Sequence, residues 1–188
     1  MSLYCPLPEG SVRLLRLLPP SDEKSRIDCQ LITRSLLDSG RTHPYDALSY
    51  AWGTEENNQP SIYIDGNEQS TRPNLYKALL HLRDCFVERI MWIDAICINQ
   101  DDNDEKGRQV QSMAKIYAKA SRVVVWLGDA ADSSDRALEA IRAAAEEQHV
   151  NPPTDEAIQQ AILALLKREW FERIWVSGRN WDGRTPES

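Results

Sequence analysis

Polar and aromatic side chains stand where three predicted strands end, and these side chains could bind a ligand. The strands are Ala47–Trp52, Met91–Asp94 and Val123–Leu127. In an open sheet of parallel strands, ligands bind beyond the carboxyl ends of the strands. The residues expected at this edge are Tyr50, Trp52, Gly53, Asp94, Cys97, Asn99, Gln100, Gly128 and Asp129. Their convergence predicts a binding site at one edge of the sheet.

Each of the strongest candidates also has a structural interpretation. A carboxylate among apolar strand residues is costly to bury without a partner. Asp94 therefore either accepts backbone hydrogen bonds from a loop or binds a ligand, and both interpretations stay open. Trp52 is favoured as a packing residue at the sheet end over a stacking platform, and Asn99 and Gln100 are expected to close a turn.

Five acidic or amide residues, Asp101–Glu105, follow this turn. A calcium loop would need alternating oxygen ligands, a central glycine and a terminal glutamate, which are missing. Carboxylates at this place suit the first turn of a helix, where they accept free N–H groups and face the positive end of the helix dipole. The histidines, His43, His81 and His149, are scattered, and we find no Ser/His/Asp signature, phosphate-binding glycine loop or metal motif.

A predicted strand–helix–strand unit from Met91 to Gly128 positions these residues. Its first strand, Met91–Asp94, could extend through the apolar residues Ala95–Ile98. Its helix has an apolar stripe at helical spacing, formed by Val110, Met113, Ile116, Tyr117 and Ala120. A unit of this length predicts two parallel strands in a sheet that is covered on both faces.

The rest of the sequence predicts two hairpins and three helices. The hairpins are Val12–Leu18 with Arg26–Ile32, and Ser61–Asp65 with Glu68–Thr71, which turns at Asp65-Gly66-Asn67. A helix starting at Pro73 is expected to bury Leu75, Ala78, Leu79, Leu82 and Phe86. Helix 134–148 should bury Leu138, Ile141 and Ala145, and a helix capped by Thr154 should bury Ile158, Ile162 and Leu165. Trp170, Phe171 and Ile174–Val176 form a last apolar cluster.

Length and composition limit the class of protein. A chain of 188 residues suggests one domain, and 22 basic against 29 acidic residues, without a basic stripe, argue against a nucleic-acid surface. The four cysteines are widely spaced, which favours reduced thiols over a zinc site. No apolar run approaches the roughly 20 residues that span a bilayer, and the N-terminus has no apolar signal core. Cytoplasm is the expected compartment, and entry into the nucleus stays open.

Four blocks of sequence resemble one family. They are Tyr45–Gly53 (YDALSYAWG), Met91–Asp102 (MWIDAICINQDD), Met113–Tyr117 (MAKIY) and Arg122–Gly128 (RVVVWLG). In this order and spacing they resemble the heterokaryon-incompatibility (HET) domain of filamentous fungi. The resemblance extends over residues 12–176, which leaves 1–11 as an N-terminal tail and 177–188 as a disordered or non-family tail.

The resemblance implies a fold and a role. It implies an α/β fold related to Toll/interleukin-receptor (TIR) domains: a flavodoxin-like parallel sheet flanked by helices, with an added N-terminal β-hairpin. It also implies fungal nonself recognition and programmed cell death, through self-association or other incompatibility proteins as partners. No cofactor, nucleic acid or membrane span is expected.

An enzymatic alternative follows from the same resemblance, because some TIR domains cleave NAD with a glutamate on a late helix. The block Arg168–Val176 matches the family, but the Gln-Glu pair expected after it is replaced by Gly178 and Arg179. Arginine cannot replace a carboxylate that stabilises a developing cation. The assembly role is therefore favoured for this chain, with NAD as a substrate under the alternative. A truncated or read-through gene model would explain the departure.

Overall fold

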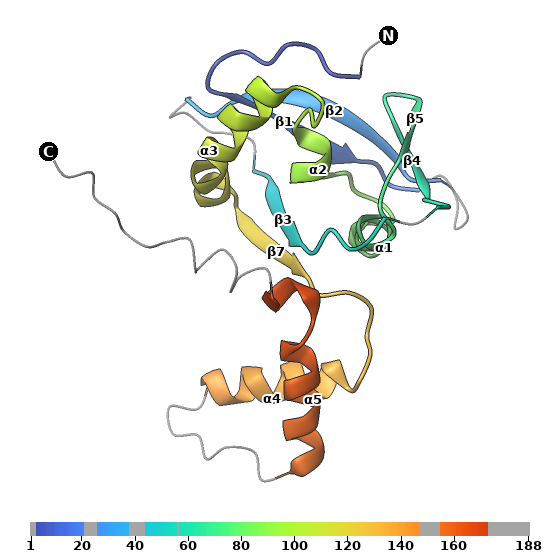
Figure 1. Ribbon diagram of the computed structural model, residues 1–188, viewed down its shortest axis with the longest axis vertical. Coiled ribbons are helices and arrows are strands. Elements are labelled where there is room, and N and C mark those ends of the chain that lie inside the picture. The colour runs from blue at the N-terminus through green and yellow to red at the C-terminus, as the bar shows by residue number, and fades with distance from the viewer. Residues whose placement is uncertain (1–2, 21–25, 38–43, 56, 147–154, 173–188) are drawn as a thin grey trace, which may run out of the picture. The chain divides into compact units, whose positions relative to one another are not determined.

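The computed structural model describes residues 3–20, 26–37, 44–55, 57–146 and 155–172. The chain divides into two compact units, Met1–Trp126 and Leu127–Ser188 (Figure 1). The first unit has the strands β1 Ser11–Leu17, β2 Asp28–Ser35, β3 Asp46–Tyr50, β4 Ser61–Ile64, β5 Asn67–Ser70, β6 Arg89–Trp92 and β7 Arg122–Trp126. Its helices are α1 Pro73–Leu82, α2 Asp94–Cys97 and α3 Asn103–Lys119. The second unit has α4 Ser134–Glu146 and α5 Glu156–Leu166.

The strands form one mixed sheet in the order β5-β4-β2-β1-β6-β3-β7. Strands β6, β3 and β7 are parallel. They lie side by side in the order β6-β3-β7. Because β3 comes first along the chain, β6 second and β7 third, this is the order 2-1-3 with which a flavodoxin-like sheet begins. The β1–β2 hairpin joins this parallel part through the antiparallel pair β1–β6. The α/β prediction with an added N-terminal hairpin is therefore confirmed.

The second predicted hairpin is also confirmed. Strands β4 and β5 pair antiparallel from Ser61↔Ser70 to Ile64↔Asn67. Asp65 and Gly66 form its turn with positive φ angles of 50° and 78°. Two successive positive φ angles match the right-handed twist of the strands, and Asp-Gly adopts them at low cost. The hairpin reaches the main sheet through the parallel pair β2–β4.

The amino ends of the three parallel strands are joined by one carboxylate. Asp46, the first residue of β3, accepts hydrogen bonds from Arg89 Nε of β6 at 2.9 Å and Arg122 Nε of β7 at 2.8 Å. Burial of Asp46 opposes its ionisation, but the hydrogen bonds from Arg122 and Arg89 outweigh this effect and lower its pKa. The opposite, carboxyl ends of these strands remain available for a site.

The predicted extension of the β6 strand through Ala95–Ile98 is wrong. The chain turns there into the short helix α2, in which Cys97 N–H donates to Ile93 O at 2.7 Å. Asp94 Oδ1 accepts the N–H of Ala95 at 2.8 Å, so the carboxylate satisfies a free donor in the first turn. Apolar runs of this length do not distinguish a strand from a buried helical turn.

Several residues expected in buried stripes are exposed. Phe86 is 90% exposed because α1 ends at Leu82 and Arg83 is extended, so helical spacing does not continue to it. Val110 is 51% exposed, and the buried residues of α3 are Ile116, as predicted, together with Glu105 and Gln109. In α4, Leu138 and Ile141 are exposed while Ala137 is buried. Glu105 and Gln109 are buried with hydrogen-bond partners, Arg13 and Ser11 O, and Ala137 packs in one apolar cluster with Ala161 and Leu165.

The expectation that both faces of the sheet are covered is wrong for β7. This strand ends the sheet order, and its side chains Val123 and Val125 are 47% and 40% exposed. Val124, between them, points to the other face and packs against the core. Half of the predicted apolar run therefore faces away from the core.

Some predictions fall outside the described residues. They concern His43, His149, Thr154, Ile174–Val176, Gly178 and Arg179, and the tail 177–188.

Helix α5 is capped by Asp155, whose side chain accepts the N–H of Ala157 at 2.9 Å. Among the described residues, no helix has the length and apolar character needed to cross a membrane.

Candidate functional site

A cavity of about 360 Å³ opens beside the carboxyl ends of β3 and β6. Apolar side chains from the sheet and α1 form part of its wall, and aromatic, amide and charged groups form the rest. Its principal polar and aromatic residues are Tyr4, Trp52, Glu55, Arg72, Gln100 and Lys106. An apolar wall with a few convergent polar groups is the usual composition of a small-molecule site.

Asp94 lies next to this cavity and has protein partners on both carboxylate oxygens. Its Oδ2 accepts the indole N–H of Trp52 at 3.0 Å, and its Oδ1 accepts the N–H of Ala95. Its carbonyl accepts Gln100 Nε2 at 3.0 Å. The predicted partner for this carboxylate is present, and Asp94 joins the end of β3 to the end of β6.

The Trp52 indole forms an aromatic wall of the cavity, and a cation lies against its ring. The Arg72 guanidinium lies 5.2 Å from the centre of the indole ring. Arg72 also donates to Gly53 O at 2.9 Å and to Glu55 Oε1 at 2.7 Å. The Arg72 side chain is thus held by the loop after β3, and it also lines the cavity. Trp52 can therefore pack at the end of the sheet, as predicted, and still present its ring to the cavity.

Asn99 and Gln100 close the turn between α2 and α3, as predicted. Asn99 Oδ1 accepts the N–H of Asp101 at 3.2 Å. Asp102 caps α3 and accepts the N–H groups of Asp104 and Glu105 at 3.0 and 2.9 Å. The capping interpretation of the acidic run is therefore confirmed for Asp102.

The remaining predicted site residues divide between the two units. Tyr50 is 5% exposed and lines the cavity, and Gly53 has a positive φ of 70° where the chain leaves β3. Gly128, with a φ of 94°, and Asp129 belong to the second unit. The structure thus assembles Tyr50, Trp52, Gly53, Asp94, Asn99 and Gln100 in one unit.

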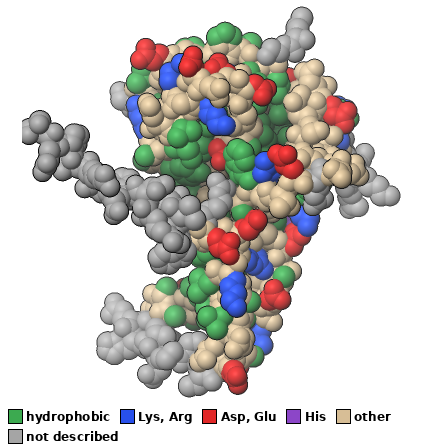
Figure 2. All heavy atoms as spheres, viewed as in Figure 1, with side chains coloured by type: hydrophobic (Ala, Val, Ile, Leu, Met, Phe, Trp, Pro, Cys, Tyr) green, Lys and Arg blue, Asp and Glu red, His purple; other side chains and the backbone are tan. Residues whose placement is uncertain are grey.

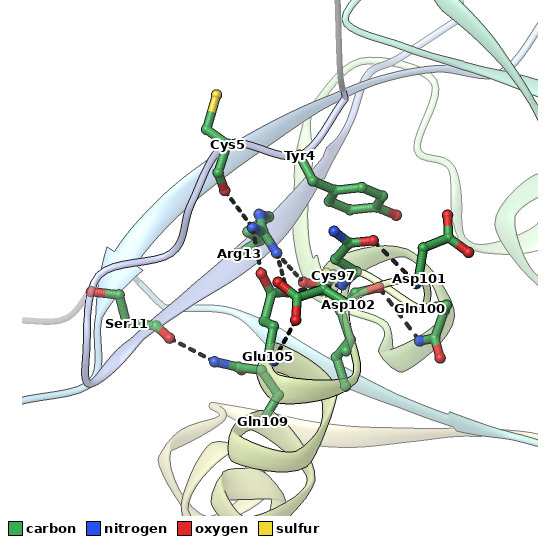
Figure 3. A network of polar contacts seen from close by, with 12 residues as sticks. Tyr4, Cys5, Ser11, Arg13, Cys97, Gln100, Asp101, Asp102, Glu105 and Gln109 are labelled. Atoms are coloured by element: carbon green, nitrogen blue, oxygen red, sulfur yellow. Dashed lines mark hydrogen bonds and ion pairs between the residues drawn. The ribbon is translucent and has the colours of Figure 1, made fainter.

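Glu105 is a residue whose role the sequence did not reveal. It is 3% exposed and forms a two-pronged ion pair with Arg13 of β1, which is 4% exposed (Figure 3). Arg13 also donates to Cys5 O at 2.6 Å, and Asn99 N–H donates to Glu105 Oε1 at 2.9 Å. The pair joins the N-terminal segment, β1, the turn and α3.

The sequence held one signal for this pair. Arg13 interrupts the apolar strand VRLLRLL, and an arginine in a buried strand needs a carboxylate partner. Glu105 was concealed because an acidic residue at the third helical position also fits a cap. Only the approach of α3 to β1 selects Glu105 from its acidic neighbours.

The ion pair changes the protonation of Glu105. Burial opposes its ionisation, but the hydrogen bonds from Arg13 and Asn99 N–H outweigh burial and hold the Glu105 pKa below its usual value. Near the same network, burial raises the pKa of the Cys97 thiol to about 12. Cys97 is therefore a protonated thiol at neutral pH and not a nucleophile.

The cavity presents aromatic surfaces beside charges of both signs. Trp52 and Tyr4 offer aromatic surfaces, Lys106 offers positive charge, and the charge of Arg72 is paired with that of Glu55. On the face shown in Figure 2, acidic and basic side chains of the described residues are interspersed and no basic stripe stands out. On this face, the described residues therefore do not form the basic surface that a nucleic-acid backbone requires.

The sequence and the fold now define a class. The family model described as "Heterokaryon incompatibility protein (HET)" matches residues 45–177, which include β3, the cavity loops and the second unit's helices. The chain therefore belongs to the HET family, as its sequence blocks predicted. The relation to TIR domains stays a prediction, because no solved structure matches the chain.

A curated relative gives the family assignment a biological setting. The chain is similar to "Heterokaryon incompatibility protein 6, OR allele" of Neurospora crassa, with 34% identity over 216 aligned positions. The match covers 90% of this chain and 31% of the relative. The chain thus spans about a third of the length of that relative.

The buried pair predicts a large energetic coupling between Arg13 and Glu105. Arg13→Met and Glu105→Gln should each lower the free energy of unfolding by about 3–5 kcal/mol, because each leaves a buried charge or its partners unpaired. The double variant should lose less than the sum of the two. Urea unfolding of all four proteins measures the coupling.

The partly exposed pair Arg16–Glu88 is the matched control. Its atoms lie 3.6 Å apart, and its side chains are 30% and 46% exposed. The cycle of Arg16→Met and Glu88→Gln should give a coupling of about 0–1 kcal/mol. Equal coupling in the two cycles would contradict the structural role of the Arg13–Glu105 pair.

The lowered pKa of Glu105 predicts a pH dependence. The stabilisation is fully present above the ordinary glutamate pKa of about 4.3. It is lost as the pH falls through the lower folded-state pKa, because Glu105 must then take up a proton. The stability difference between the parent chain and Glu105→Gln should therefore shrink in acid. Urea midpoints from neutral to acidic pH measure this, and a constant difference would contradict it.

Proposed function

We propose that this chain is an effector module of fungal nonself recognition, which promotes programmed cell death by self-association or by binding other incompatibility proteins. The observation that carries the proposal is the family match over residues 45–177, together with the similarity to an incompatibility protein of Neurospora crassa. The compartment proposed for this activity is the cytoplasm.

The chemistry of the described residues is consistent with a module that binds and does not itself react. Asp94 and Glu105 have protein partners, and the thiols of Cys29 and Cys97 have pKa values raised to about 12 by burial. A signalling role needs a stable surface and a ligand or partner that changes its assembly. A TIR-like mode of signalling is part of this proposal.

The test is inducible expression of the chain in a compatible fungal strain. Expression should reduce the number of viable colonies, because the effector would act without a nonself partner at high concentration. Arg13→Met should abolish the effect through loss of folded protein, whereas Phe86→Ala, at a 90% exposed side chain, should retain it. Equal killing by Arg13→Met at equal protein level would indicate unspecific toxicity and contradict the proposal.

The second candidate function is cleavage of NAD, and the specific observation favouring it is the cavity. NAD has planar bases and two phosphates, for which the cavity offers aromatic walls and the cations Lys106 and Arg72, the latter paired with Glu55. The cavity also contains the carboxylate of Glu55. In this alternative Trp52, Asp94 and their neighbours hold NAD, and a carboxylate must face the ribosyl carbon.

Binding and turnover of NAD separate the two candidates. If the cavity takes NAD, Arg72→Ala should weaken binding at least about tenfold, because a charge-assisted contact is worth about 1.5–3 kcal/mol. Turnover should appear only after Gly178→Gln and Arg179→Glu restore the family carboxylate. Calorimetry and nicotinamide release measure these outcomes. Absence of both binding and turnover, in proteins shown to be folded, would reject the enzyme.

A further inference from the structure

Three amide side chains line the cavity beside Trp52. Gln59 precedes β4, Gln69 lies in β5, and Gln100 closes the turn before α3. Among the described residues, the side chains of Gln59 and Gln69 have no protein hydrogen-bond partner. Gln100 donates through Nε2 to Asp94 O at 3.0 Å, which leaves its Oε1 as an acceptor. Three segments that are far apart in the sequence therefore bring uncharged hydrogen-bonding groups to one space.

The charges that line the same cavity largely cancel. Arg72 Nη2 lies 2.7 Å from Glu55 Oε1, and both side chains line the cavity, so the pair adds no net charge. Lys106, the other cation of the lining, directly follows the acidic run Asp101–Glu105. Tight binding of a polyanion relies on cations that are not already paired. The lining therefore favours a ligand that carries no charge.

Carboxylates also lie close to both aromatic walls. Asp94 Oδ2 accepts the indole N–H of Trp52 at 3.0 Å. Burial is the largest cause that raises the pKa of the Tyr4 phenol, and the carboxylate of Asp101 acts in the same direction. Like charges that are brought together oppose binding. These two carboxylates would repel an anionic ligand held against Trp52 and Tyr4, and they would not repel an uncharged one.

The amides and the aromatic walls together suit one class of uncharged ligand. A glutamine amide both donates and accepts hydrogen bonds, as a sugar hydroxyl does. The C–H groups on one face of a sugar ring pack against an aromatic ring, and Trp52 and Tyr4 offer such surfaces. The cavity volume of about 360 Å³ is in the range of small-molecule sites.

We propose that this cavity binds an uncharged saccharide, which packs against Trp52 and forms hydrogen bonds with the amides of Gln59, Gln69 and Gln100. A free sugar and the terminal ring of a glycan share this chemistry. The proposal goes beyond the effector role, for which no ligand has been named, and it does not depend on that role.

The experiment is an NMR titration of the full chain with N-acetylglucosamine, a neutral ring that carries both hydroxyls and an amide. The reporter is the indole N–H resonance of Trp52, which is assigned by its loss in Trp52→Phe. A single ring should bind with a Kd on the order of 1 mM. Glucuronate, a similar ring with a carboxylate, should bind at least about tenfold more weakly because of the nearby carboxylates. The trimer of N-acetylglucosamine should bind as the monomer does if the ligand is a free sugar, and more tightly if it is a glycan.

The amides are tested by Gln59→Leu combined with Gln69→Leu. This double variant should bind N-acetylglucosamine at least about fivefold more weakly, because two hydrogen bonds to the sugar are lost. Gln111→Leu is the matched control, since Gln111 is exposed on α3 and does not line this cavity. It should bind like the parent, and unchanged resonances of the other tryptophans show that each variant is folded.

Four results would overturn the proposal. They are no sugar binding by the folded parent, glucuronate binding as tight as that of N-acetylglucosamine, unchanged affinity in the double variant, and tighter binding of NAD than of the neutral sugar. The last result would assign the cavity to the dinucleotide instead. The colony assay tests the effector role separately, so failure of one proposal is distinguishable from failure of the other.

Discussion

The buried ion pair between Arg13 and Glu105 is the constraint on which the first unit depends. Arg13 enters the interior from β1, and Glu105 comes from the first turn of α3. Neither charge is stable there without the other. The pair fixes α3 against β1 and, through Asn99 N–H and Cys5 O, orders the turn and the N-terminal segment (Figure 3).

The amino ends and the carboxyl ends of the parallel strands have different roles. At the amino ends, Asp46 with Arg89 and Arg122 joins the three strands through charge-assisted hydrogen bonds. At the carboxyl ends, the loops diverge, and Trp52 and Asp94 hold them around a cavity. Because these ion pairs hold the strands in register at their amino ends, the loops at the carboxyl ends can vary without changing the strand pairing.

The cavity depends on the strands that the Asp46 cluster holds in register. Trp52 lies beyond the end of β3, and Ala95 and Ile96 lie beyond the end of β6; all three line the cavity. Asp94 joins these two strand ends by accepting the hydrogen bond of the Trp52 indole. A ligand that entered the cavity would therefore contact both loops.

The sequence by itself determined the α/β class, the hairpins, the cap at Asp102 and the family, because each depends on local periodicity, turn chemistry or contiguous motifs. It also placed Trp52, Asp94 and Gln100 at one sheet edge, since parallel strands share their carboxyl ends. Tertiary structure alone decided that Ala95–Ile98 is helical, that Glu105 pairs with Arg13, and that Val123 and Val125 face outward. These outcomes depend on which distant segment arrives to satisfy a charge or cover an apolar face. Local sequence does not contain that information, because the partners lie far apart along the chain.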